Sequence, residues 1–431
     1  MRIERLRLSN YRGFAELDLE FPKHGTTVLV GNNGAGKTSI LDAIGTLLQR
    51  LIRELRWSGV MGEKLSYSDV RLDSKLCIVE LSAALPMGDA QPGNFTWHAS
   101  LPKDQGEESQ ARRFKQALGV FRDPSYSSPF LGHFSVERSL HGDVSTWLSL
   151  QGEPDEGSDG TESPITTEYS DFVRWFFDRE NLENEQIREE PTFRDPELSV
   201  VRSGVERFCE GFTNLRIRRA RSSMPTIGLR HTRSSTTFIV DKLVNGRKRV
   251  FELDQLSHGE RGLLALVGII ARPLAMLNAN RADPLDGPGV VLIDEIELHL
   301  HPGWQRDIIP RLERTFPNVQ FIVTTHSPQV LSQLRPENIK IIEDFKLVER
   351  TPPTYGRDSN AILEDVMGVS ERPLFATEKL AEVAALIDDE NWVAARDRLH
   401  ELARDLGTLD AEVVRLRTMI DMLDDARDAA K

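Results

Sequence analysis

A short stretch near the N-terminus has the residue types and spacing of a phosphate-binding loop. Gly31 to Ser39 reads Gly-Asn-Asn-Gly-Ala-Gly-Lys-Thr-Ser, which satisfies G-x-x-x-x-G-K-[ST]. Its glycines let successive backbone N–H groups turn inward around α- and β-phosphates, while Lys37 reaches the β- and γ-phosphates and the Thr38 hydroxyl ligates Mg²⁺. The loop therefore predicts a bound nucleoside triphosphate with Mg²⁺, held by Asn32, Asn33, Gly34, Ala35, Gly36, Lys37, Thr38 and Ser39.

Two adjacent carboxylates follow an apolar run much later in the chain. Val290-Val291-Leu292-Ile293 leads into Asp294 and Glu295. At the end of a buried strand, Asp294 is expected to support Mg²⁺ through water, and Glu295 to orient and deprotonate an attacking water. The alternative, a surface pair that caps the strand, is less favoured because the carboxyl ends of parallel strands are where α/β sheets bind ligands.

A third motif, Leu256-Ser257-His258-Gly259-Glu260-Arg261, lies at the start of a long apolar helix. Ser257 and the Gly259 N–H would lie at a helix N-terminus, which suits a γ-phosphate. The same letters fit a capping box in which Ser257 is the N-cap and Glu260 lies three residues on.

Histidines mark two further places. His326, in Thr324-Thr325-His326-Ser327-Pro328, follows a buried strand and is expected to contact the γ-phosphate. His299 and His301, in His-Leu-His-Pro, suggest a metal pair, but no third ligand is evident, so a loop that contacts another subunit is the better interpretation.

The pattern around these motifs predicts an α/β fold. A strand over 27–30 leads into the glycine-rich loop, and a helix from Ser39 to about Leu51 follows it. The runs 290–293 and 321–323 have the uniform apolar composition of buried parallel strands. Residues 2–8 and 17–21 alternate as two half-buried strands around a turn at Asn10 to Phe14.

Composition sets outer bounds on the type of protein. The chain has 431 residues, a net charge of −13 and 39% hydrophobic residues, which is ordinary for a globular protein. It has neither an apolar run of about 18 residues nor an N-terminal signal-peptide pattern, so we expect a cytoplasmic protein without a membrane partner. The cysteines Cys77 and Cys209 are far apart in sequence and form no C-x-x-C motif, so we expect neither a disulfide framework nor a cysteine-built zinc site.

The pattern divides the chain into four segments. Residues 1–140 are expected to form the N-terminal part of the nucleotide-binding head, and residues 213–350 its C-terminal part. Between them, 141–212 should hold an acidic loop at 152–164 and a helical insertion with helices over 169–188 and 196–212. A polar helix is expected near 107–118, and a hairpin at Asn245-Gly246. Residues 351–431 should form a linker and a tail of three short helices.

The order of these motifs resembles the SMC/RecF/OLD branch of the ABC-type ATPases. Members also begin with N-[FY]-[RK], here Asn10-Tyr11-Arg12. The resemblance implies ATP as the nucleotide and an ABC-type head with a mixed sheet flanked by helices. It further implies that Asn10 and Arg12 approach the phosphates, and that two heads sandwich ATP so that Ser257 and Gly259 act in trans.

Further stretches resemble the PtuA-like ATPases of Septu and retron-associated antiphage systems. They are Asp171 to Phe176 with Glu183 to Glu185, Gly356 to Asp365, and the helical tail. The resemblance implies Mg²⁺-dependent ATP hydrolysis, ATP-dependent self-association and regulation of a partner effector, a nuclease. A Q-loop glutamine is not assigned: Gln151 lies in the wrong context, and the strand end near Val136 offers Glu137 and Arg138 instead.

Two other functions remain open. Arginine-rich strands at 214–221 and 247–249 fit a RecF-like repair ATPase that binds DNA, although a sheet edge paired with acids explains them equally well. An OLD-type nuclease would need a further α/β domain with acidic strand ends, whereas residues 366–431 have a helical pattern, so this function is the least favoured.

Overall fold

The computed structural model describes residues 1–56, 65–87, 90–102, 129–134, 169–222 and 233–429. The chain divides into two compact units, Met1–Ser359 and Asn360–Lys431. The expected acidic loop at 152–164, the polar helix near 107–118, and Glu137, Arg138 and Gln151 lie outside the described residues.

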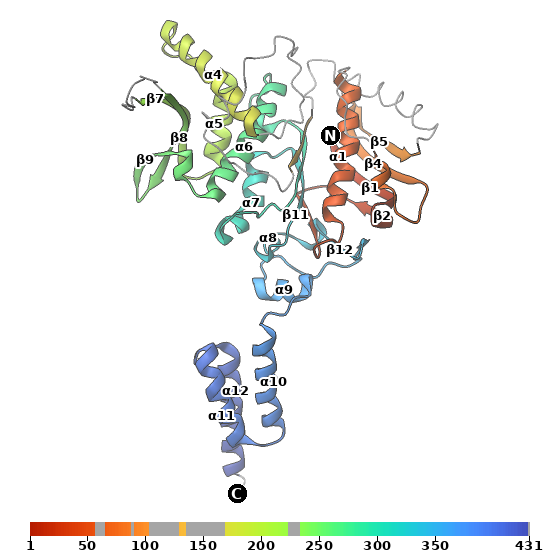
Figure 1. The fold of residues 1–431 in the computed structure, drawn as a ribbon, viewed down its shortest axis with the longest axis vertical. Helices are drawn as coiled ribbons and strands as arrows, with labels where there is room; N and C mark the ends of the chain where they lie inside the picture. The colour runs from red at the N-terminus through yellow and green to blue at the C-terminus, as the bar shows by residue number, and fades with distance from the viewer. Residues whose placement is uncertain (57–64, 88–89, 103–128, 135–168, 223–232, 430–431) are drawn as a thin grey trace, which may run out of the picture. The chain divides into compact units, whose positions relative to one another are not determined.

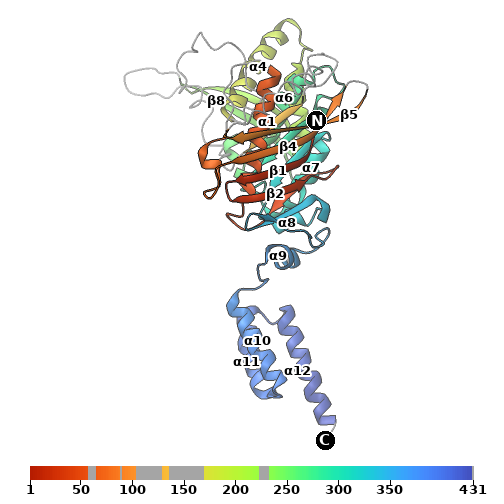
Figure 2. The same cartoon turned by 90° about the vertical axis from the view of Figure 1, so that its right-hand side faces the viewer.

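An antiparallel sheet opens the first unit. It contains β1 (Arg2–Tyr11), β2 (Phe14–Glu20), β4 (Cys77–Met87) and β5 (Ala90–Leu101) in the order β2-β1-β4-β5 (Figure 2). Alternate residues such as Leu6 and Leu8 are buried, as a sheet with one face on the core requires. The two N-terminal strands predicted from the alternation are confirmed.

A second sheet carries most of the motif strands. It contains β3 (Thr27–Val30), β6 (Phe130–Phe134), β10 (Gly289–Ile293), β11 (Val319–Thr324), β12 (Ile339–Glu343) and β13 (Lys346–Leu347), in the order β13-β12-β3-β11-β10-β6. All pairings are parallel except β12–β13. Every residue of β3, β10 and β11 is buried, which confirms the predicted strand over 27–30 and the predicted buried parallel strands over 290–293 and 321–323.

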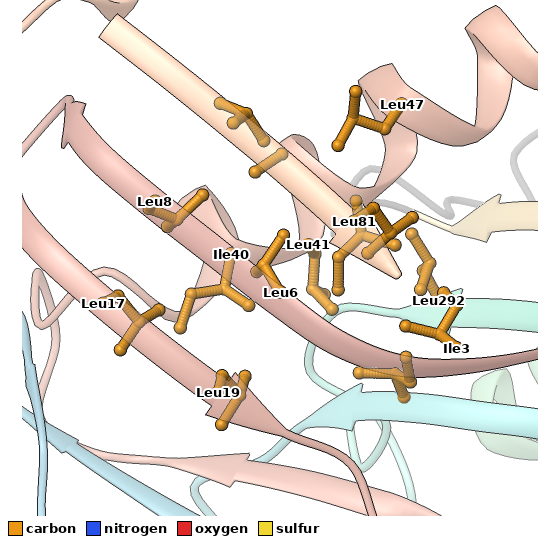
Figure 3. Close-up of a cluster of buried hydrophobic side chains, with 14 of the residues drawn as sticks. Ile3, Leu6, Leu8, Leu17, Leu19, Ile40, Leu41, Leu47, Leu81 and Leu292 are labelled. Carbon is orange, nitrogen blue, oxygen red and sulfur yellow. The ribbon is translucent and has the colours of Figure 1, made fainter. Parts of the chain in front are cut away.

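Helix α1 (Lys37–Arg56) packs between the two sheets. Ile40, Leu41 and Leu47 join Leu6, Leu17 and Leu81 of the antiparallel sheet and Leu292 of the parallel sheet in one apolar cluster (Figure 3). The helix begins two residues before the predicted start at Ser39. Because α1 buries apolar side chains against both sheets, this packing fixes the position of the helix.

The first unit also contains a group of helices, α4 to α7, and a small third sheet (Figure 1). Helix α6 of this group contacts β6 of the parallel sheet. Helix α5 (Pro196–Phe208) contacts α6 (His258–Leu277) and α7 (Pro302–Thr315), while α4 (Tyr169–Glu189) contacts α5 and α6. Phe172 and Phe176 of α4 pack against Phe238. The prediction that α5 extends to Phe212 is wrong: the helix ends at Phe208, because the chain turns at Gly211 and enters β7.

The small sheet has the order β7-β8-β9, with β7 (Phe212–Ser222), β8 (Arg233–Val244) and β9 (Arg247–Glu252). Asn245 and Gly246 have φ of 51° and 74° between β8 and β9. Positive φ at both central residues is the geometry of a type I′ hairpin turn, so the predicted hairpin is confirmed.

Within the described residues, the second unit contains α9 (Ser359–Met367), which begins at its boundary, followed by three tail helices: α10 (Leu374–Asp388), α11 (Trp392–Leu406) and α12 (Ala411–Ala429). Val383, Leu399 and Leu416, one from each tail helix, belong to its buried core. The three predicted tail helices are confirmed. Within the described residues, no helix is long and apolar enough to cross a membrane.

Candidate functional site

The glycine-rich loop joins β3 to the first turn of α1. Gly36 has φ of 103°, and a Cβ there would lie 2.6 Å from the Phe14 ring, so glycine is required at this position. The Lys37 ammonium folds back over the loop and donates to the carbonyl oxygens of Gly31 (2.9 Å) and Asn32 (3.0 Å). Burial lowers the pKa of Lys37, and the nearby Asp294, Glu295 and Glu297 oppose this effect.

Hydrogen bonds connect the predicted metal-supporting pair. Thr38 Oγ1 donates to Asp294 Oδ2 at 2.9 Å, and Thr324 Oγ1 donates to the other carboxylate oxygen. Asp294 is 4% exposed. The first turn of α1 and the ends of β10 and β11 therefore converge, as the parallel strand order requires. A hydroxyl beside a carboxylate is the hard oxygen set that Mg²⁺ prefers, so these residues fit the implied ion.

Glu295 follows in an unusual backbone conformation. Its φ is 47°, and its N–H donates to Thr324 Oγ1 at 2.7 Å. A non-glycine residue in this region costs on the order of 1–3 kcal/mol and persists where surrounding contacts impose it, which is common at functional sites. Thr324 thus fixes both Asp294 and Glu295, while the role of Glu295 as base stays a prediction.

Glu297, which was not predicted as a site residue, holds the loop that carries His326. Thr325 Oγ1 donates to Glu297 Oε2 at 2.7 Å, and the His326 N–H donates to Oε1 of the same carboxylate. Ser327 caps α8 (Pro328–Leu331) by accepting from Gln329 N at 3.2 Å. Glu297 therefore ties the loop after β10 to the loop after β11. Its only sequence signal is its place two residues after Glu295.

Asn10 lies near the end of β1 and Arg12 in the β1–β2 turn, both with positive φ (52° and 48°). The Arg12 guanidinium donates to Asp42 Oδ2 at 2.6 Å and to Asp69 Oδ1 at 3.0 Å, and it lies 3.5 Å from Ser39 Oγ. Burial lowers the pKa of Arg12, but the hydrogen bonds to Asp42 and Asp69 raise it above its ordinary value. Arg12 is thus held, charged, beside the first turn of α1, and phosphate contact stays a prediction.

The Ser257 motif begins α6 as a capping box. Ser257 Oγ accepts from Glu260 N at 3.3 Å, and Ser257 N donates to Glu260 Oε2 at 3.1 Å. Lys242 of β8 donates to the other Glu260 oxygen. Burial raises the pKa of Glu260, but its hydrogen bonds with Lys242 and Ser257 outweigh that effect and keep the pKa below its ordinary value. The capping box is therefore present in the structure, while phosphate binding by Ser257 and Gly259 stays a prediction.

The His-Leu-His-Pro loop packs against this helix start. A Cβ on Gly259 would lie 2.8 Å from the His299 carbonyl oxygen, so the two segments touch closely. His301 accepts through Nδ1 from Gly303 N at 3.2 Å and caps α7. The loop therefore links the Ser257 motif to the segment after β10 that carries Asp294 and Glu295.

Charges on the arginine-rich strands are partly neutralised inside the small sheet. Arg216 pairs with Asp241 at 2.8 Å, and Arg218 pairs with Glu252. The cations of β9 (Arg247, Lys248 and Arg249) are exposed. The acid-paired alternative thus holds for Arg216 and Arg218.

Two family models match the chain. Residues 159–332 match "AAA domain, putative AbiEii toxin, Type IV TA system", and residues 5–83 match "AAA domain". Among solved structures, an SMC head bound to the C-winged helix domain of ScpA is similar, at 17% identity over 81% of this chain and 97% of that chain with a TM-score of 0.43. The recombination mediator RecF is similar at 17% identity over 80% and 97%, with a TM-score of 0.40.

Curated relatives match nearly the whole chain. The retron Vc95 probable ATPase of Vibrio cholerae is 30% identical over 90% of this chain and 82% of its own length. The retron Ec83 probable ATPase of Escherichia coli is 29% identical over 98% and 87%, and the Septu protein PtuA of Bacillus thuringiensis is 26% identical over 90% and 90%. The chain therefore belongs to the family of ATPases that contains the retron Vc95 and Ec83 probable ATPases, and it is related to the Septu protein PtuA.

Proposed function

We propose that the chain is an ATP-hydrolysing switch of an antiphage defence system, which self-associates on ATP and regulates a partner effector, a nuclease. The observation that carries the proposal is the hydrogen-bonded set Thr38–Asp294–Thr324–Glu295 directly beside the buried Lys37. The family membership and the names of the retron and Septu relatives support the defence context.

The residues of the loop have distinct roles in this proposal. Lys37 and the backbone N–H groups from Asn32 to Ser39 hold the phosphates, and Asn10 and Arg12 approach them from the end of β1 and the β1–β2 turn. Thr38 and Asp294 would hold Mg²⁺, which supplies charge neutralisation at the β- and γ-phosphates. Glu295 accepts a proton from the attacking water, and His326 contacts the γ-phosphate.

The proposed self-association involves the second half of the site, the Ser257 motif. Ser257 and Gly259 lie at the N-terminus of a 20-residue helix, where N–H groups and the helix dipole favour an anion. We place the partner copy's γ-phosphate there. The hydrogen bonds of Ser257 run to Glu260 of its own helix, which supports a half-site that is built locally. In this proposal a second chain completes it.

The central test is Glu295→Gln in the full-length chain. The substitution keeps the size of the side chain and removes its basicity. We expect ATP turnover to fall by about 10²–10⁴-fold, while an ATP-dependent increase in mass by light scattering persists. Hydrolysis at the wild-type rate would refute Glu295 as the base.

A partner surface is supported on α12. Met419, Met422 and Leu423 are 40%, 67% and 39% exposed and line a hollow of about 450 Å³ with Arg415 and Thr418. We expect Met422→Asp to abolish co-purification with the effector encoded by a neighbouring gene and to leave ATP turnover unchanged. Intact co-purification would exclude this face as the docking site.

DNA binding is a second candidate function, favoured by the exposed cations of β9. In that case affinity for duplex DNA would fall steeply with salt, and a triple substitution of Arg247, Lys248 and Arg249 by Glu would remove it. No binding at low salt leaves the partner-protein function in place.

A further inference from the structure

A bulky aromatic residue occupies a turn position that rarely accepts one. Asp344 and Phe345 are the two turn residues between β12 and β13, because Glu343 pairs directly with Lys346. Their φ values are 45° and 60°. Two-residue turns of this type favour Asn and Gly, and a bulky side chain at positive φ is strained. Such strain persists where tertiary contacts impose it.

The Phe345 ring lies between two loops of the candidate site. A Cβ built on Gly13 would meet three ring atoms of Phe345 at 2.2–2.4 Å, and one built on Gly36 would meet the same ring at 2.9 Å. The ring also packs edge-on against Phe14, with centroids 5.3 Å apart and planes at 89°. Phe345 therefore touches both the β1–β2 turn and the glycine-rich loop.

Both glycines that Phe345 contacts are adjacent in sequence to a residue that is predicted to face phosphate. Gly13 follows Arg12, and Gly36 precedes Lys37. A glycine-rich loop has many accessible conformations, and ordering it on binding costs free energy. A ring wedged between the two loops restricts both before the ligand arrives.

We propose that Phe345 is a positioning residue that locks the β1–β2 turn against the glycine-rich loop and thereby sets the affinity for the nucleoside triphosphate. The inference rests on the proposed ATP site. Phe345 does not act on the phosphates itself; it acts through the placement of Arg12 and Lys37.

The first experiment compares Phe345→Ala with the wild-type full-length chain. We expect the Kd of a fluorescent ATP analogue and the KM for ATP to rise about tenfold, with kcat within about twofold. Amide hydrogen exchange across residues 31–36, measured without nucleotide, should accelerate. Phe345→Tyr should restore both properties. Phe375→Ala, which removes an exposed ring from the second unit, is the matched control and should change neither.

A double-mutant comparison isolates the contact. Gly13 does not have positive φ, and the three atoms nearest to an added Cβ all belong to Phe345, so Phe345→Ala should relieve the weaker binding caused by Gly13→Ala. Gly36 has φ of 103°, so Gly36→Ala should stay defective in the Phe345→Ala background.

Two results would overturn the inference. One is unchanged exchange and an unchanged Kd in Phe345→Ala; the other is full additivity of Gly13→Ala with Phe345→Ala. Failure of the wild-type chain to bind ATP at all would instead refute the proposed function, and the exchange measurement would still show whether Phe345 locks the loop.

Discussion

The two halves of the candidate site are built in different ways. Lys37 and Asp294 are buried, and the site forms because the first turn of α1 and the ends of β10 and β11, far apart in sequence, converge at one edge of the parallel sheet. Ser257 and Glu260 are bonded to each other within one helical turn, and Ser257 is exposed. The first half is a tertiary construction, whereas the second is a local helix start. A local half-site can be presented to another molecule without rearranging the core.

The largest effect on ATP binding should come from the half of the site that contains Lys37, Thr38 and Asp294. We expect Lys37→Ala to reduce ATP binding by at least about a hundredfold, because the phosphate charge loses its nearest cation. Thermal stability should not fall, since burial already disfavours the charged lysine. Lys346→Ala, on the exposed strand β13, is the control. A calorimetric titration with ATP and a melting curve test both statements, and retained binding would contradict the assignment of the loop.

The next effect tests whether the local half acts on a second chain. Ser257→Arg should abolish turnover while its own glycine-rich loop stays intact. An equimolar mixture of Lys37→Ala and Ser257→Arg chains should recover roughly a quarter of the wild-type rate, because half of the dimers then contain one intact composite site of two. No recovery in mixtures that exchange subunits would show that Ser257 does not act in trans.

A smaller effect is expected at the connection between strands β10 and β11. Glu297→Gln loses one acceptor for the Thr325 hydroxyl or the His326 N–H, so His326 should be misplaced and kcat should fall about tenfold with KM little changed. Glu313 accepts a similar pair of bonds from Thr26 N and Oγ1. Glu313→Gln therefore serves as the control, and an equal loss of kcat in both variants would point to a general loss of stability.

The smallest effect is expected on the free energy of unfolding, when the Lys242–Glu260 ion pair beside the Ser257 motif is removed. The lowered pKa of Glu260 means that its ion pair stabilises the fold above the ordinary value of 4.5, and that this contribution disappears as the pH falls through the lower folded-state pKa. Lys242→Met should cost about 1 kcal/mol at pH 7 and nothing measurable once Glu260 is protonated. Urea denaturation at pH 7 and in acid measures this, with Lys248→Met as the exposed control. A pH-independent loss would indicate packing instead.

Local sequence patterns predicted much of the frame. Uniformly apolar runs identified β3, β10 and β11, and Asn245-Gly246 identified the hairpin, because each signal is complete within a few residues. Strand β12 was not predicted: it is an edge-side strand whose role depends on its pairing with β3. Helix α5 was predicted too long because tertiary pairing of β7 begins at Phe212.

The site residues divide along the same line. The motifs supplied Lys37, Thr38 and Asp294, and the structure joins them through hydrogen bonds. Glu297 and Asp42 were missed because their partners, Thr325 and Arg12, are distant in sequence and only the fold brings them close. The pairing of Arg218 with Glu252 was likewise invisible, since it depends on the register of three strands.

The order of the parallel sheet has a consequence for protein synthesis. Strand β3, which leads into the glycine-rich loop, lies between β11 and β12, and these follow it only at residues 319 and 339. A nascent chain on the ribosome therefore exposes the apolar β3 long before its two sheet neighbours have been translated, whereas α1 can pack early against the antiparallel sheet. The Thr38–Asp294 hydrogen bond can form only after residue 294 has been translated, so the candidate site is completed late in synthesis.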